Sequence, residues 1–165
     1  MQDEELTKTT FVTAVMFDDL NEMIKLREAG CPFGTASFAM AARLGGKDGL
    51  EKMRWLRSQG CSWDAETFTN AVRAASKDDD LENLEYLALI DCPWDTSTFS
   101  EAISGGNMKV IKWLSNPTST GNFGRVYKRD PCPMDDQTKD MVREMIGILS
   151  QIVGDYVLKD SCVDH

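Results

Sequence analysis

The sequence predicts an all-α fold, a helix-pair solenoid of about four repeats with a terminal capping helix. The first observation is a short turn that recurs along the chain, at Cys31, Cys61, Cys92 and Cys132. The second is a fixed frame around the first three cysteines, with a leucine 11 residues before each and a phenylalanine 7 residues after it. The third is the helical spacing of the apolar residues between the turns. A unit repeated in this way indicates stacked helical units.

Apolar residues three positions apart predict the second helix of each pair, because residues at this spacing share one helix face. We expect these helices to end at residues suited to the left-handed conformation, namely Gly30, Gly60 and Asp91. The apolar sets are Leu20, Met23 and Leu26; Leu50, Met53 and Leu56; Leu81, Leu84 and Leu87; and Met108, Ile111 and Leu114.

An N-cap residue three positions after each cysteine predicts the start of the first helix of each pair. The residues at that position are Gly34, Asp64, Asp95 and Asp135. Three of these helices then carry a phenylalanine and, three residues later, an alanine, which we expect to face inward where helices cross closely. These pairs are Phe38 and Ala41, Phe68 and Ala71, and Phe99 and Ala102.

The basic period is 27 residues, and the two middle units carry extra residues at 45–49 and 76–80, between their helices. We therefore expect a single domain, 1–165. Its parts are repeats at about 5–30, 35–60, 65–91 and 96–114, an insertion loop at 115–131 and a C-terminal cap at 132–158. Lys25 and Lys139 stand where other units carry an aromatic residue, which indicates that both ends are capped and that the array is whole.

Aromatic residues mark two further positions of the unit. Trp55, Tyr86 and Trp113 lie in the second helices, where we expect them to pack against the preceding unit. Trp63 and Trp94 follow their cysteines by two residues and could serve as stacking platforms. We favour the alternative, that they are buried residues of the repeat signature.

The placement of the cysteines argues against disulfides and against a metal site. Four of the five cysteines occupy the same position in successive units, which stack about 8–10 Å apart. A disulfide needs Cα atoms closer than about 7 Å, and there is no Cys-x-x-Cys pair to hold zinc. We interpret these cysteines as small buried apolar residues.

The net charge of −9 argues against binding to nucleic acid, which requires a basic surface. The first residues, Met1 to Glu5, are acidic, whereas a secretory signal begins with positive charge. No apolar stretch approaches the roughly 20 residues that span a bilayer. We expect a cytoplasmic protein, with a nuclear location also open, that binds neither nucleic acid nor membrane.

The repeated Leu-x-x-Met/Leu-x-aromatic-Leu segment followed by Cys-Pro-Trp-Asp, complete at Cys92 to Asp95, resembles the short ankyrin-like repeats of algae, oomycetes and large DNA viruses of amoebae. The resemblance covers about 11–114, with a degraded unit at 132–153. Phe33, Gly34 and Ser62 are among the departures from the signature. The resemblance implies an ankyrin-like solenoid that binds other proteins and has no chemistry of its own.

Little in the sequence indicates catalysis, because the only histidine is the last residue, His165. We expect no catalytic residue, no cofactor and no metal. The predicted function is a non-catalytic protein–protein interaction scaffold or adaptor, monomeric, that binds another protein through the first helices. The alternatives are an orphan or structural repeat protein without a dedicated partner, or an enzyme with an unrecognised site. The candidate exposed positions are Met40, Arg43, Thr69, Asn70, Arg73, Ser100 and Glu101.

Of the three segments 1–114, 115–131 and 132–165, only the insertion 115–131 carries net positive charge, and it is the best single candidate for a binding element. Its basic residues could contact an acidic or phosphorylated segment while its aromatic residues supply an apolar anchor. Two alternatives are a tolerated insertion without function and a loop whose basic residues fold back on the acidic body. The candidate residues are Phe123, Arg125, Tyr127, Lys128 and Arg129.

Overall fold

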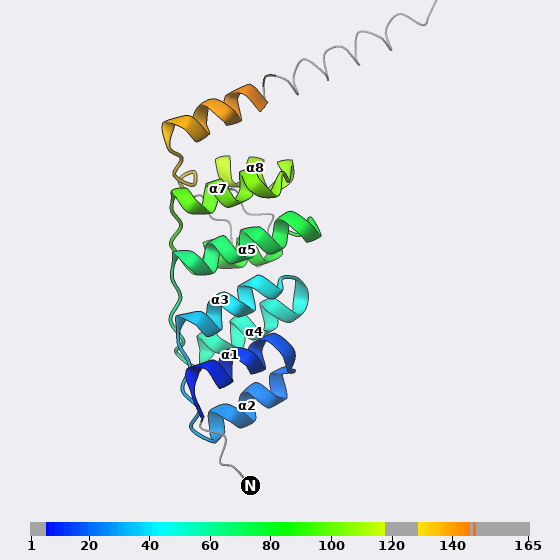
Figure 1. Ribbon diagram of the computed structural model, residues 1–165, viewed down its shortest axis with the longest axis vertical. Coiled ribbons are helices and arrows are strands. Elements are labelled where there is room, and N and C mark those ends of the chain that lie inside the picture. Colours follow the sequence, from blue (N-terminus) through cyan, green and yellow to red (C-terminus); the bar gives the residue numbers. More distant parts are fainter. Residues whose placement is uncertain (1–5, 118–128, 146, 148–165) are drawn as a thin grey trace, which may run out of the picture. The chain divides into compact units, whose positions relative to one another are not determined.

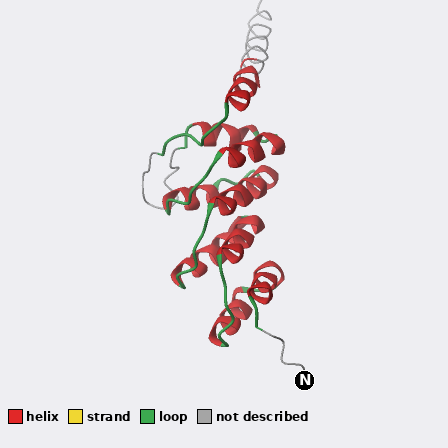
Figure 2. Ribbon diagram, turned by 60° about the vertical axis from the view of Figure 1, so that its left-hand side comes forward, coloured by secondary structure: helices red, strands yellow, loops and turns green. Residues whose placement is uncertain are grey.

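The computed structural model describes residues 6–117, 129–145 and 147 (Figure 1). The chain divides into two compact units, Met1–Pro133 and Met134–His165, which are treated separately below. The described residues form helices and loops and contain no strand (Figure 2), so the predicted all-α class is confirmed for them. The helices of the first unit are α1 (Lys8–Phe17), α2 (Leu20–Glu28), α3 (Thr35–Leu44), α4 (Gly46–Ser58), α5 (Ala65–Asp78), α6 (Glu82–Leu89), α7 (Thr96–Gly105) and α8 (Met108–Ser115).

The helices of the first unit form pairs that lie in two rows. The first helices contact one another in order, α1 against α3, α3 against α5 and α5 against α7 (Figure 1). Each also contacts the second helix of its own pair, and α4 contacts α6 in the second row. The phenylalanines and alanines predicted to face inward are fully buried in the first helices.

A capping box starts each of the helices α5 and α7. The Asp64 carboxylate accepts from the Thr67 amide at 3.2 Å, and the Thr67 hydroxyl accepts from the Asp64 amide at 3.4 Å. Asp95 and Thr98 make the same reciprocal pair at 3.3 Å in both directions. The predicted helix starts are therefore confirmed, and they satisfy two amides that a helix N-terminus otherwise leaves without acceptors.

The second helices end in a shared hydrogen-bonded turn. The residue at the left-handed position is the predicted one, with φ of 85° at Gly30, 78° at Gly60 and 56° at Asp91. The next residue is the cysteine, whose amide donates to a leucine carbonyl five residues earlier, as in a Schellman motif. These bonds join Cys31 to Leu26 at 2.9 Å, Cys61 to Leu56 at 3.0 Å and Cys92 to Leu87 at 2.9 Å.

The same hydrogen bond closes the fourth pair across the insertion. The Cys132 amide donates to the Leu114 carbonyl at 2.9 Å, although 115–131 lie between them. The insertion is therefore placed within a turn that the other pairs make with four residues, and its two ends are held together.

Each cysteine thiol joins the turn that follows a helix pair to the start of that pair. Each thiol donates a weak hydrogen bond to the carbonyl of the N-cap residue of the preceding first helix, at 3.3–3.5 Å. All four are buried and free. The pairs are Cys31 with Thr7, Cys61 with Gly34, Cys92 with Asp64 and Cys132 with Asp95. Cysteine thus combines a small volume with a hydrogen-bond donor that reaches the neighbouring backbone. The fifth cysteine, Cys162, lies outside the described residues.

Two aromatic residues of the second helices pack against the preceding unit, as predicted. The Trp55 ring stacks on Phe11, with 6.3 Å between ring centroids and 8° between ring planes. The Trp113 ring stacks on Phe68 at 6.4 Å and 20°. At the corresponding position of the first helix pair, Lys25 is exposed and forms an ion pair with Glu22.

The extra residues of the two middle pairs lengthen helices rather than form loops. In the second pair α4 begins early, at Gly46, and in the third pair α5 continues to Asp78. Gly45 ends α3 and precedes α4 directly, with φ of 69°. A Cβ atom there would lie 3.0 Å from the Ala74 Cβ atom, so both the backbone conformation and the close approach favour glycine.

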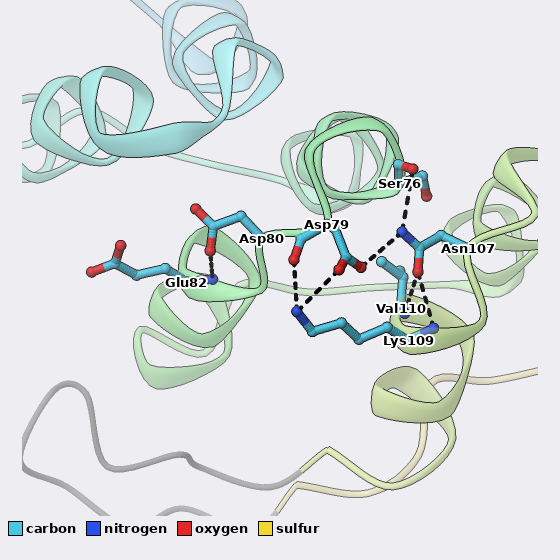
Figure 3. Close-up of polar contacts among 7 residues, drawn as sticks. All are labelled: Ser76, Asp79, Asp80, Glu82, Asn107, Lys109 and Val110. Carbon is cyan, nitrogen blue, oxygen red and sulfur yellow. Dashed lines mark hydrogen bonds and ion pairs between the residues drawn. The ribbon is translucent and has the colours of Figure 1, made fainter.

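A polar cluster joins the third pair to the start of α8 (Figure 3). The side-chain oxygen of Asn107 accepts hydrogen bonds from the backbone amides of Lys109 and Val110, and so caps the helix. The side-chain nitrogen of Asn107 donates to the backbone carbonyl of Ser76 at 3.3 Å and to the Asp79 carboxylate at 3.2 Å. The Lys109 ammonium donates to the Asp79 carbonyl at 2.7 Å. Asp79 therefore has a structural role between two units.

Lys52 makes a related contact between the first and second pairs. Its side chain is buried, and its ammonium donates to the carbonyls of Val15 at 3.0 Å and Asp18 at 2.8 Å. The same ammonium pairs with Asp48 at 3.0 Å. A cation at the C-terminal end of α1 is favourable because the helix carbonyls there carry partial negative charge.

The second unit contains a helix over 136–145, and the Asp135 carboxylate caps it by accepting from the Thr138 amide at 2.7 Å. Most of the remainder of the predicted cap 132–158 lies outside the described residues. None of the helices in the described part of the chain combines the length and apolar character of a membrane-spanning segment.

Candidate protein-binding surface

A shallow depression crosses α1, α3 and α5. Its volume is about 210 Å³. Small side chains at Ala36 and Ala39 leave this space open beside Met40. The lining residues are Val12, Ala36, Ala39, Met40, Arg43, Glu66, Asn70 and Arg73.

A second depression of about 340 Å³ continues along α5 to α7. It shares Arg73 with the first one, so the two form a continuous surface on the first helices, here called the first-helix face. The lining residues of the second depression are Arg73, Ser76, Lys77, Glu101, Ser104 and Gly105.

Arg73 and Glu101 form a two-point ion pair at the centre of the first-helix face. Arg73 Nε lies 2.7 Å from Glu101 Oε1, and Arg73 Nη2 lies 2.9 Å from Oε2. The hydrogen bonds from Arg73 lower the pKa of Glu101, and the bond to Glu101 raises the pKa of Arg73. Arg73 Nη1 also donates to the Asn70 side-chain oxygen at 3.3 Å. This part of the face is therefore fixed in geometry and internally neutral.

Asn70 differs from the sequence expectation, because it is buried rather than exposed, with an exposed fraction of 8%. Neighbouring helices and the Arg73 guanidinium cover it, although it lines the depression. Thr69 bonds Thr98 of the next unit at 3.0 Å and is half-buried. Arg43 and Ser100 are exposed, as expected.

Arg43 and Arg73 occupy equivalent positions, each five residues after the phenylalanine of its helix. The residue that faces Arg73 from the next unit is Glu101, and its equivalent one unit earlier is Asn70. Arg43 consequently has no carboxylate partner among the described residues. The result is an exposed arginine without an ion pair among the described residues, at one end of the first-helix face, in a depression that Glu66 also lines.

Sequence reasoning missed Ala36 and Glu66, which also line the first depression. A signal for both existed, because Ala36 precedes Met40 by four residues and Glu66 precedes Asn70 by four. Residues at this spacing lie on one helix face, so the predicted positions already implied them.

Arg129 lies against two aromatic rings, those of Trp94 and Phe68. Its guanidinium carbon is 3.8 Å from the Trp94 ring centroid and 5.6 Å from that of Phe68. Its Nη2 atom donates to the Cys92 carbonyl at 2.6 Å. Arg129 thus contacts the body of the first compact unit through two aromatic rings and a backbone carbonyl. These contacts do not test the interpretation in which the basic residues neutralise the acidic body.

Trp63 and Trp94 were expected to be buried, but each is only half-buried, with part of its ring surface exposed. Each packs its inner side on the preceding phenylalanine, with centroid distances of 5.3 Å for Trp63 on Phe38 and 4.9 Å for Trp94 on Phe68. Trp94 acts as a platform for Arg129. The two roles considered from the sequence are combined in one residue.

The remaining predicted residues of the insertion, Phe123, Arg125, Tyr127 and Lys128, lie outside the described residues. Within the described ranges, no three side chains of the metal-binding types gather at one point. No protein-family model matches the chain, and no curated protein matches it either.

Proposed function

We propose that this chain is an ankyrin-like helix-pair solenoid that acts as a non-catalytic interaction module and binds another protein across its first-helix face. Three features support the assignment of the architecture: the paired helices, the turn that precedes each cysteine, and the repeated thiol contact between that turn and the start of its pair. Solenoids of this type present an extended face made by equivalent helices.

Arg43 is the single observation that favours a partner. It is exposed, whereas its equivalent Arg73 is neutralised by Glu101 one unit further along. A carboxylate from a partner could pair with Arg43 as Glu101 pairs with Arg73. The open space over Ala36 and Ala39 would receive an apolar side chain next to that carboxylate. We therefore propose a partner segment with an acidic residue beside an apolar one.

The test is affinity capture from cells of the source organism with two variants that alter this face. Ala36→Trp fills the first depression at an exposed position, and Arg43→Glu reverses the unpaired charge. Both variants should lose a protein that the unmodified chain retains, and Arg43→Glu should lose at least about tenfold because a charge pair is replaced by repulsion.

Lys112→Glu is the matched control, because Lys112 is exposed on α8 and does not line the first-helix face. It changes charge by the same amount as Arg43→Glu. Retention of the captured protein by Lys112→Glu and its loss by both face variants supports the proposal. Equal capture by all four chains would exclude this face as the binding surface. Capture of no specific protein by the unmodified chain would favour the alternative of a repeat protein without a dedicated partner.

A further inference from the structure

An aromatic residue stands two positions after the cysteine in three of the turns, as Phe33, Trp63 and Trp94. In two of the three, an arginine lies over the aromatic ring. In the first case the Arg27 guanidinium lies over Phe33, 4.4 Å from the ring centroid. In the second, Arg129 lies 3.8 Å from the Trp94 centroid. Trp63 holds the equivalent position between them, and the cations placed over aromatic rings in the described residues lie over other rings.

The two cations reach equivalent positions from different parts of the chain. Arg27 stands four residues before Cys31, in the helix that precedes the turn. The residue four before Cys92 is Ala88, which is too short to reach the ring and leaves room for Arg129 from the insertion. The recurrence of a cation at this place therefore does not depend on one local sequence. It reflects the aromatic face itself, and at Trp94 the Cys92 carbonyl also accepts a hydrogen bond from the cation.

The components of the Trp94 site are repeated at Trp63. Trp63 packs on Phe38 as Trp94 packs on Phe68. The Cys61 thiol bonds the Gly34 carbonyl at 3.3 Å, as the Cys92 thiol bonds the Asp64 carbonyl at 3.4 Å. The backbone that presents the Cys92 carbonyl to Arg129 is thus reproduced one unit earlier at Cys61.

An open cavity lies at Trp63. Its volume is about 460 Å³, and it is lined by Arg57, Gly60, Cys61, Ser62 and Trp63. We propose that this cavity binds an arginine side chain of another protein, with the guanidinium over the Trp63 ring and one N–H donated to the Cys61 carbonyl. The site lies at the edge of the units and is distinct from the first-helix face. Arginine suits it because its planar cation stacks on an indole and donates at the same time.

Arg57 is the nearest competing cation, since it occupies the position equivalent to Arg27. Burial raises the pKa of the Tyr86 hydroxyl, and a hydrogen bond with the Arg57 guanidinium partly opposes this rise. It does not lie over Trp63 as Arg27 lies over Phe33. Its charge opposes a second cation nearby, so removal of Arg57 should strengthen the binding of an external arginine.

The experiment uses the full chain and the peptide acetyl-Gly-Arg-Gly-amide, with a peptide in which neutral citrulline replaces arginine. Binding is followed by nuclear magnetic resonance at the four tryptophan indole N–H groups, each assigned by a Trp→Phe substitution. The arginine peptide should shift the Trp63 signal in a saturable way and leave Trp94 unchanged. The citrulline peptide should bind roughly tenfold more weakly, because it retains the donors and loses the charge. Arg57→Gln should tighten the binding.

Arg129→Ala provides the matched control, because it empties the equivalent site at Trp94. In this variant the arginine peptide should shift both Trp63 and Trp94. If Trp94 responds in Arg129→Ala and Trp63 does not respond in either chain, the proposal is wrong. An equal effect of the citrulline peptide also overturns it. Should Arg129→Ala fail to fold, the comparison of the two peptides at Trp63 in the unmodified chain still decides.

Discussion

Burial raises the pKa of each cysteine thiol that donates to an N-cap carbonyl, to about 11 for Cys61 and about 12 for Cys92 and Cys132. A neutral thiol can donate to the N-cap carbonyl, whereas a thiolate cannot. The thiolate is also the reactive form of cysteine. The position that gives these residues their structural role therefore makes them unreactive at neutral pH.

We predict that these four thiols resist Ellman's reagent at pH 8 in the folded protein, in a Cys162→Ser background. All four should react at once in denaturant. Rapid labelling of more than one thiol without denaturant would contradict the buried arrangement.

The same pKa values predict loss of stability in alkali. The thiols ionise at pH near 9 when unfolded and only near 11–12 when folded. Their contribution is fully present below pH 9 and declines as the pH rises through the folded pKa values. Urea unfolding at pH 7 and pH 10 should show a lower free energy of unfolding at pH 10. A Cys61→Ala variant should lose part of this difference.

At the scale of the helix, the aromatic residues of the second row differ in burial, and their replacement should differ accordingly. Trp113 is 6% exposed and packs on Phe68 and Trp94, whereas Trp55 is half-buried. Trp113→Ala should cost about 3–5 kcal/mol of unfolding free energy and Trp55→Ala about 2 kcal/mol. Lys25→Ala, at the equivalent exposed position, should change it by less than about 0.5 kcal/mol. Urea denaturation measures all three, and equal effects would refute their alignment in one repeat.

The insertion is the element whose removal the structure makes most specific. Because Leu114 and Cys132 are joined as Leu56 and Cys61 are, 115–131 can be replaced by the four residues of 57–60. The shortened chain should fold with the same helical circular dichroism. Its melting temperature should fall at least as far as that of Arg129→Ala, since the replacement also removes the Arg129 contacts with the Trp94 ring and the Cys92 carbonyl. A much larger loss of stability would show that the insertion supports the core.

Sequence periodicity predicted the helix pairs, their caps and their turns, because each depends on residues close together in the chain. Gly30, Asp64 and Thr67 act through local backbone geometry, and their spacing is readable. The extra residues at 45–49 and 76–80 were less predictable, because a helix can be extended from either side of the same insertion. The sequence could not tell that 45–49 would extend α4 rather than α3, or that 76–80 would extend α5 rather than α6.

The candidate site was predicted in part. The row of first helices was identified, and Arg43, Arg73 and Glu101 line the depressions found there. The pairing of Arg73 with Glu101 joins residues 28 positions apart, and it depends on the offset between stacked helices. The burial of Asn70 depends on the same offset. The Arg129 platform required a return of the chain that no periodicity encodes.

At the scale of the whole molecule, the two proposed sites use different consequences of repetition. On the first-helix face, equivalent residues differ. Glu101 neutralises Arg73, whereas the residue equivalent to Glu101 one unit earlier is Asn70, which carries no charge to neutralise Arg43. The Trp63 site arises where equivalent residues are the same and only the cation is missing. In both, comparison of one unit with the next identifies the position open to a partner.

The central claim is that one repeated unit builds residues 6–117 and closes again at Cys132, with 115–131 inserted in a single turn. Native-state hydrogen exchange of the cysteine amides tests it most directly, because each of these amides donates the closing hydrogen bond of its turn. The Cys132 amide should be protected to a similar degree as those of Cys61 and Cys92. Exchange of Cys132 at the rate of an open chain, while the other two stay protected, would contradict the account.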